Sequence, residues 1–195
     1  MDERQIVDSA QSYIEAIFSE DYSGHDVAHS LRVYRNAMRI AQTEPQCNRL
    51  IVSLAALLHD VDDHKLFHTE NNEHARSFLV EHNVESETVE QICEVINGVS
   101  YSQNRGVSPK TIEGKIVQDA DRLDAMGAIG IARTFAYGGA HGRSIEDSMK
   151  HFDEKLLLLK NAMNTEEGRS IASSRHDFLE TFVDEIREET DLLRE

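Results

Sequence analysis

Apolar positions recur at helical spacing along almost the whole chain. They return every three or four residues, as on one face of an α-helix, and stretches that alternate apolar and polar residues are hard to find. Only two prolines interrupt the 195 residues. The pattern predicts an all-α fold with helices over about 3–18, 25–43, 46–61, 71–82, 86–99, 109–137, 145–163 and 165–193. Ser108 is expected as the N-cap of the sixth helix, with Pro109 as its first residue.

The polar segments between these helices are short. No internal repeat, low-complexity segment or Pro/Gly/Ser-rich linker separates one group of helices from another. A chain of this length also has enough apolar residues to build a core of its own. We therefore expect one domain.

Charge and cysteine content narrow the class of protein. With 36 acidic and 20 basic residues the formal net charge is -16, which argues against a nucleic acid polymer as partner. No apolar stretch is long enough to cross a bilayer, and the first residues lack the pattern of a secretory signal, so we expect no membrane partner. Cys47 and Cys93 lack metal-site spacing and are typical of reduced cysteines in a cytoplasmic protein. The oligomeric state stays open, with a homodimer among the alternatives.

The dipeptide His59-Asp60 stands at the end of an apolar run that covers residues 50–58. A helix this apolar is normally buried, and a buried carboxylate needs a cation or several hydrogen-bond donors to offset its lost hydration. Both residues are also of types that bind metals. The dipeptide therefore predicts a site that other segments complete.

Two further segments offer metal-ligand types. His25 and His29 are four residues apart, hence on one face of the predicted helix, although for this segment alone two satisfied histidines are the better explanation. Asp119, Asp121 and Asp124 interrupt a helix that is otherwise mostly apolar, so burial of at least one of them is expected. Asp121 and Asp124 share a face of that helix, and Asp119 points elsewhere.

Taken together, these segments resemble the HD-domain metal-dependent phosphohydrolases, in particular their small bacterial YedJ/YpgQ-like branch. His29, His59-Asp60 and Asp121 match the H...HD...D signature in order. The likeness extends to HDVAHSLRV (25–33), LHDVDDHK (58–65), QDADRLDAMGAIGIAR (118–133) and HFDEKLL (151–157). It implies one HD-type helical bundle over 1–195, with a metal-binding core at about 22–130 and additional C-terminal helices at about 145–194 packing on it.

By this resemblance, one divalent metal ion would be held by His29, His59, Asp60 and Asp121. Asp119 is the main rival of Asp121, and His25 and Asp124 would lie close by, behind the ligands or beside the substrate. Two imidazoles and two carboxylates suit Mn²⁺, Mg²⁺, Co²⁺, Ni²⁺ or Fe²⁺. Relatives with two metals carry further histidines before the last aspartate, and none falls in 90–119 here, which favours one metal.

A divalent ion in such a shell would lower the pKa of a bound water and neutralise charge on a phosphoryl oxygen, so water can attack phosphorus directly. The resemblance makes Asp63 the catalytic residue that takes the proton, with Asp62 as its competitor. Because the net charge is strongly negative, a phosphate needs a local set of basic residues. The candidates beside the motifs are Arg32, Lys65, Arg122, Lys155 and Arg175.

The resemblance therefore implies a metal-dependent phosphohydrolase acting on a small phosphorylated metabolite. A nucleotide is the expected substrate, with pyrophosphate release from a nucleoside triphosphate as one version and a nucleoside 5'-monophosphatase as another. A guanosine tetraphosphate hydrolase would be expected to show Glu-Asp where this chain has Asp63-His64. The competing class is a metal or nucleotide sensor without turnover, which would be expected to have lost a ligand.

Overall fold

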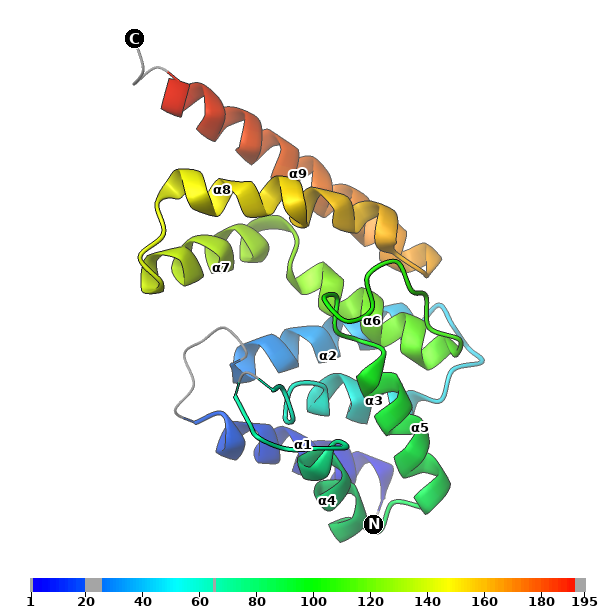
Figure 1. Ribbon diagram of the computed structural model, residues 1–195. Helices are drawn as coiled ribbons and strands as arrows, with labels where there is room; N and C mark the ends of the chain where they lie inside the picture. Colours follow the sequence, from blue (N-terminus) through cyan, green and yellow to red (C-terminus); the bar gives the residue numbers. More distant parts are fainter. Residues whose placement is uncertain (1, 20–25, 65, 192–195) are drawn as a thin grey trace. The chain divides into compact units, whose positions relative to one another are not determined.

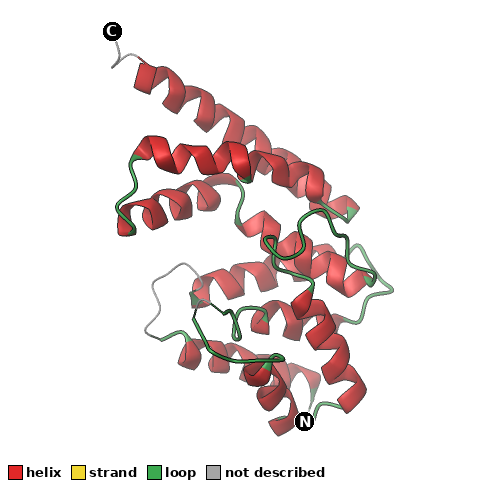
Figure 2. Cartoon of the chain, viewed as in Figure 1, coloured by secondary structure: helices red, strands yellow, loops and turns green. Residues whose placement is uncertain are grey.

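The computed structural model describes residues 2–19, 26–64 and 66–191 of the chain. All regular structure in these ranges is helical, which confirms the all-α prediction (Figures 1 and 2). The α-helices are α1 (Glu3–Ile17), α2 (Val27–Ala41), α3 (Arg49–Leu58), α4 (Glu73–Glu81), α5 (Ser86–Asn97), α6 (Ile112–Asp124), α7 (Gly127–Ala140), α8 (Ile145–Glu154) and α9 (Glu166–Asp191). A 3-10 helix, η1 (Leu156–Ala162), lies between the last two.

The chain forms two compact units, Met1–Asp121 and Arg122–Glu195. The first contains α1 to α5 and most of α6, and the second contains the end of α6 and all later helices. In the second unit, α7 packs against α8 and α9, and η1 packs against the same two helices. One domain over the whole chain, with its C-terminal helices on a metal-binding core, stays a prediction.

Helix α3 is the core of the first unit. Every residue from Ile51 to Leu58 is buried, and the helix packs against α1, α2 and α5. Partners on several sides explain why its sequence is apolar all round rather than on one stripe. The chain leaves this helix at His59-Asp60, and both residues are buried.

The predicted helix over 109–137 is wrong, because the structure breaks it into α6 and α7. The break falls at Ala125 and Met126, and Gly127 begins α7 with φ +67°, a left-handed conformation that ends regular α-helix. The expected start at Ser108 and Pro109 is also wrong. Helix α6 begins at Ile112, and the Thr111 hydroxyl accepts from the Gly114 N–H at 3.1 Å.

The predicted helix over 145–163 also changes form. Helix α8 ends at Glu154, and the run of four leucines that follows Lys155 continues as the 3-10 helix η1. Leu156 and Leu159 are its buried residues, and their spacing of three matches the three residues per turn of this helix type. Apolar periodicity alone does not separate the two helix types over so short a segment.

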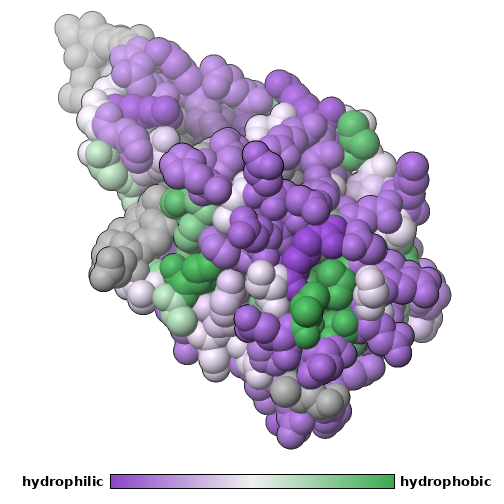
Figure 3. Space-filling view, turned by 60° about the horizontal axis from the view of Figure 1, so that its bottom comes forward, coloured by the Kyte–Doolittle hydropathy of each residue, from purple (hydrophilic) through white to green (hydrophobic). Residues whose placement is uncertain are grey.

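The surface is consistent with the strongly acidic composition. On the face of the molecule shown in Figure 3, hydrophilic residues predominate and hydrophobic ones form small patches. In the described part of the chain, no helix has the length and apolar character needed to span a membrane.

Candidate metal centre

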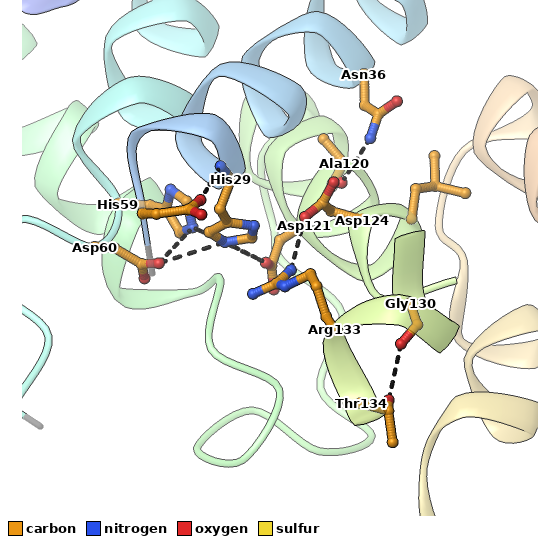
Figure 4. Close-up of polar contacts among 12 residues, drawn as sticks. His29, Asn36, His59, Asp60, Ala120, Asp121, Asp124, Gly130, Arg133 and Thr134 are labelled. Carbon is orange, nitrogen blue, oxygen red and sulfur yellow. Dashed lines mark hydrogen bonds and ion pairs between the residues drawn. The ribbon is translucent and has the colours of Figure 1, made fainter. Parts of the chain in front are cut away.

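Four side chains of the first unit point toward one another (Figure 4). The Nε2 atoms of His29 and His59 are 3.2 Å apart. Asp60 Oδ2 lies 3.4 Å from His29 Nε2 and 3.3 Å from His59 Nε2. Asp121 Oδ1 lies 3.5 Å and 3.9 Å from the same two nitrogens. The side chains predicted as ligands, contributed by three separate segments, therefore meet in one place.

His29 is positioned by the cap of its own helix. Helix α2 has Asp26 as its N-cap, and Asp26 Oδ1 accepts a hydrogen bond from the His29 N–H at 2.7 Å. This bond satisfies one of the N–H groups that a helix start leaves unpaired, and it places His29 in the first turn. The aspartate of the His-Asp-x-x-His sequence is thus a helix cap. His25, expected to share a helix face with His29, lies outside the described residues.

His59 closes the other end of a helix. It is the C-cap of α3, and its Nδ1 lies 3.0 Å from the carbonyl oxygen of Ala56. A carbonyl oxygen only accepts, so Nδ1 carries the proton, and the lone pair of the neutral ring is on Nε2. The helix carbonyl thereby sets the tautomer in which Nε2 can bind a metal, as an outer partner commonly does at metal sites.

The acidic ligands come from the end of α3 and from α6. Asp60 is 8% exposed, and its carboxylate is turned toward the two imidazoles. On α6, Asp121 contributes its oxygen to the cluster, and the rival Asp119, two residues earlier, lies on a different side of the helix. Asp119 is fully buried and has a contact of its own.

The distances from each carboxylate to the two imidazole nitrogens are of the size found within a coordination shell. Nitrogen and oxygen ligands bind such ions at about 2.0–2.2 Å, so neighbouring ligand atoms lie roughly 3 Å apart and opposite ones about 4 Å apart. The observed separations of 3.2–3.9 Å fall in this range. His29, His59 and Asp121 also stand out among the described residues as a group able to hold a metal ion. Asp60 is not part of that group, so its role as the fourth ligand stays a prediction. Two nitrogens and two carboxylates favour a borderline or hard divalent ion over thiolate-bound zinc.

The two aspartates after the dipeptide have different surroundings. Asp62 is 7% exposed, and its two oxygens accept from the N–H groups of His74 and Ala75, both at 3.0 Å. Asp63 is more exposed, at 16%, and its Oδ1 lies 3.7 Å from His64 Nδ1. The carboxylate of Asp62 is thus occupied in capping α4, which favours Asp63 as the catalytic residue. That role stays a prediction.

The basic residues expected to bind phosphate fall into different parts of the chain. Arg32 is on α2, three residues after His29, and is partly buried. Lys65 lies outside the described residues. In the second unit, Lys155 follows the last residue of α8 and is partly buried.

The two predicted phosphate-binding arginines of the second unit bond to main chain there. Arg122 is 3% exposed and donates to the carbonyl oxygen of Ala162, at the end of η1. Arg175 donates to the carbonyl oxygen of Leu123, near the end of α6. Carbonyls at helix ends lack intrahelical partners, so both contacts are of a structural kind. A phosphate-binding role for either arginine stays a prediction.

Asp124 is paired within the second unit. It is 2% exposed, and its Oδ2 accepts from Arg133 Nη1 at 2.7 Å (Figure 4). The pair joins the last residue of α6 to α7. A role for Asp124 beside the metal or substrate stays a prediction.

Asn36 was not predicted from the sequence; it lies seven residues after His29 and hence on the same face of α2. Its side-chain amide donates to the carbonyl oxygen of Ala120 at 3.3 Å. The bond ties α2 to α6 at the residue before Asp121. The sequence does hold a signal for Asn36, because it is a polar residue two turns from a proposed ligand on a helix face that carries buried residues.

This geometry is accompanied by a clear family relationship. The HD domain family model matches residues 27–126, just over half the chain and the part that contains all four side chains of the cluster. The chain therefore belongs to the HD domain family. The signature predicted from the sequence is confirmed at the level of the family.

Full-length relatives support the same assignment. The chain is 37% identical to the uncharacterized protein YpgQ of Bacillus subtilis, over 97% of this chain and 96% of that protein. An HD-superfamily hydrolase from Bacillus thuringiensis has a similar structure, with a TM-score of 0.81 and 38% identity, covering 97% of this chain and 99% of that one. The crystal structure of Bacillus subtilis YpgQ in complex with ADP matches with a TM-score of 0.80 and 33% identity, covering 94% and 97% of the two chains.

Proposed function

We propose that this chain is a metal-dependent phosphohydrolase that acts on a small nucleotide. The observation that carries the proposal is the meeting of His29, His59, Asp60 and Asp121 with atom separations of 3.2–3.9 Å. Two imidazoles and two carboxylates gathered in this way are ligand types that a divalent ion takes. Membership of the HD domain family supports the same reaction class.

The ion would be held by the two Nε2 atoms and the two carboxylates. When bound, it would lower the pKa of a coordinated water and neutralise charge on a phosphoryl oxygen. The imidazole of His59 contributes a lone pair because its Nδ1 proton is held by Ala56. The donor set leaves the choice among Mn²⁺, Mg²⁺, Co²⁺, Ni²⁺ and Fe²⁺ to experiment.

Asp63 is proposed as the general base. Its carboxylate accepts a proton from the water whose oxygen forms the new bond to phosphorus, while the bond from phosphorus to the leaving oxygen breaks. Asp62 is unsuited to this part because both its oxygens accept from main-chain N–H groups. Arg32, Lys65, Arg122, Lys155 and Arg175 are the basic residues proposed to offset the phosphate charge.

A nucleotide is the proposed substrate because a relative of this chain, YpgQ, has been crystallised with ADP. A nucleoside triphosphate that releases pyrophosphate is the version we favour.

We also propose that the protein acts in the cytoplasm. Both cysteines are free, and burial raises the pKa of the Cys93 thiol, which keeps it protonated and unreactive.

A hydrolysis screen tests the proposal. Purified protein is incubated with Mn²⁺, Co²⁺ or Mg²⁺ and with nucleoside tri-, di- and monophosphates, and phosphate and pyrophosphate are measured separately. We expect hydrolysis that requires a metal and that Asp60→Ala abolishes without unfolding the protein. Asp63→Asn should lower kcat about 10²–10⁴-fold while the affinity for Mn²⁺ is kept.

The exposed Asp184 of α9 offers a matched control, because Asp184→Asn removes the same charge elsewhere and should leave kcat unchanged. Nucleotide binding without turnover under every metal would instead identify a sensor and overturn the proposed activity. Release of phosphate from monophosphates alone would identify a 5'-monophosphatase.

A further inference from the structure

The two residues after His59-Asp60 are bonded to the start of α4. Asp62 Oδ1 accepts from the His74 N–H and Asp62 Oδ2 from the Ala75 N–H, each at 3.0 Å. In the opposite direction, His74 Nδ1 lies 2.8 Å from the carbonyl oxygen of Val61, and because that oxygen only accepts, Nδ1 is the donor. Three hydrogen bonds therefore join this short segment to one helix end.

Helix α4 depends on this contact for its cap. Its N-cap residue, Asn72, has φ 56° and ψ 46° and makes no side-chain cap bond. The first N–H groups of a helix have no partner within the helix, and a carboxylate at this end is favoured by the helix dipole. Asp62, which is distant in sequence, supplies both the acceptors and the charge that the helix's own cap residue does not.

Aromatic side chains lie around this contact. The ring of His74 meets Phe67 edge-on, with centroids 5.1 Å apart and an interplanar angle of 90°. On the side of α1, burial and the nearby carboxylates of Asp62 and Glu81 raise the pKa of the Tyr13 phenol. Hydrogen bonds in such partly dry surroundings are stronger than the same bonds in water.

The bonded segment lies between two functional residues. Asp60 comes before Val61, Asp63 comes after Asp62, and the Asp63 N–H donates to the Asp60 carbonyl oxygen at 3.0 Å, which closes the turn. Once the middle of this turn is attached to α4, the backbone directions at its two ends are set as well. The carboxylates of Asp60 and Asp63 depart from those two ends.

We propose that Asp62 and His74 are positioning residues, which attach this turn to α4 and so direct Asp60 at the metal and Asp63 at the substrate. The inference rests on the function proposed above for Asp60 and Asp63. It assigns the α4 N-terminus an indirect part in the reaction, through the orientation of Asp60 and Asp63. Loss of a partner that orients a ligand typically costs about 10–100-fold in metal affinity or activity.

Measurements on the full chain test the proposal. Mn²⁺ affinity is measured by titration calorimetry without nucleotide, kcat and KM with nucleotide, and Tm by thermal unfolding. Asp62→Ala and His74→Ala should each weaken Mn²⁺ binding about 10–100-fold and lower kcat. Ser144→Ala is the matched control, because it removes the N-cap bond of α8, 3.0 Å from the Asp147 N–H, and should lower Tm with Mn²⁺ affinity unchanged.

A pair of conservative variants keeps the test decisive if the alanine variants do not fold. The amide nitrogen of Asn can take the place of His Nδ1, whereas that of Gln reaches the place of Nε2. His74→Asn should therefore keep the bond to Val61 and retain Mn²⁺ affinity, and His74→Gln should lose both. Equal affinities for these two variants would overturn the proposal. So would alanine variants that lower Tm as Ser144→Ala does but leave Mn²⁺ affinity and kcat unchanged.

The two proposals fail in different ways. Metal affinity is measured without substrate, so an unmutated protein that binds Mn²⁺ but hydrolyses no nucleotide would overturn the proposed function and leave the positioning role supported or refuted by the calorimetry. An active protein whose Asp62 and His74 variants keep full Mn²⁺ affinity and kcat would overturn only the positioning role.

Discussion

Polar side chains are buried in both units of the chain, but their partners differ in kind. In the first unit, the Nε2 atoms of His29 and His59 face the carboxylate oxygens of Asp60 and Asp121. In the second unit, buried Arg122 donates to a helix-end carbonyl of its own unit. The first group brings metal-ligand types together from three segments, whereas the second pairs a guanidinium donor with a carbonyl acceptor, and this difference separates a proposed cation site from a structural contact.

The largest expected effect is the loss of Mn²⁺ affinity and hydrolysis on replacing a proposed ligand of the first unit. Asp121→Asn keeps the size of the side chain but removes a charge from the proposed shell. We expect Mn²⁺ affinity and hydrolysis to fall by more than the roughly 10–100-fold that an outer partner contributes. Titration calorimetry and phosphate release measure the two losses. Asp119→Asn is the comparison, and a greater loss of affinity there would make Asp119 the ligand.

Adding Mn²⁺ should stabilise the folded protein, because the ion would bind the proposed site in the first unit. An ion that binds only the folded state raises the free energy of unfolding by about 2.7 kcal/mol at a free concentration 100 times its Kd. Urea unfolding with Mn²⁺ and with a chelator measures the difference. Asp121→Asn should show little or no shift on adding Mn²⁺, and an unchanged shift in that variant would place the ion elsewhere.

Removing a main-chain contact in the second unit should lower stability without changing metal affinity. Arg122→Met keeps much of the apolar stem but leaves the Ala162 carbonyl without this donor. The free energy of unfolding should fall by about 1–3 kcal/mol, measured as a lower urea midpoint at an unchanged slope. Mn²⁺ affinity of the folded protein should stay the same, and a marked loss of that affinity would contradict the contrast between the units.

A smaller effect is expected from His151 in the second unit. Burial, with the positive charges of Lys155 and Arg143 acting against nearby Glu154, holds the pKa of His151 below its ordinary value of 6.5. Below that pH the unfolded chain takes up more protons than the folded one, so acidification costs stability until the folded pKa is passed. His151→Gln should flatten this slope in urea unfolding measured at a series of pH values. An identical slope would show that other groups cause it.

Much of the architecture was predictable because it depends on neighbours in the chain. Apolar spacing of three and four residues located helices such as α1, α3 and α5 within a few residues of their observed ends. The break between α6 and α7 could not be predicted in this way, because it depends on the positive φ of Gly127 and on contacts outside the helix. At the site, the family signature predicted which residue types come together, and the burial of His59-Asp60 followed from the apolar run before it.

The sequence by itself determined the helical class, the HD signature and the residues able to bind a metal, because periodicity and motif spacing are local properties of the chain. Only the tertiary structure decided how those residues are used. It brought Asp121 rather than Asp119 to the two histidines, and it engaged the carboxylate of Asp62 at the start of α4. Such choices depend on hydrogen bonds between segments distant in sequence, and no local pattern encodes which partner a buried carboxylate will find.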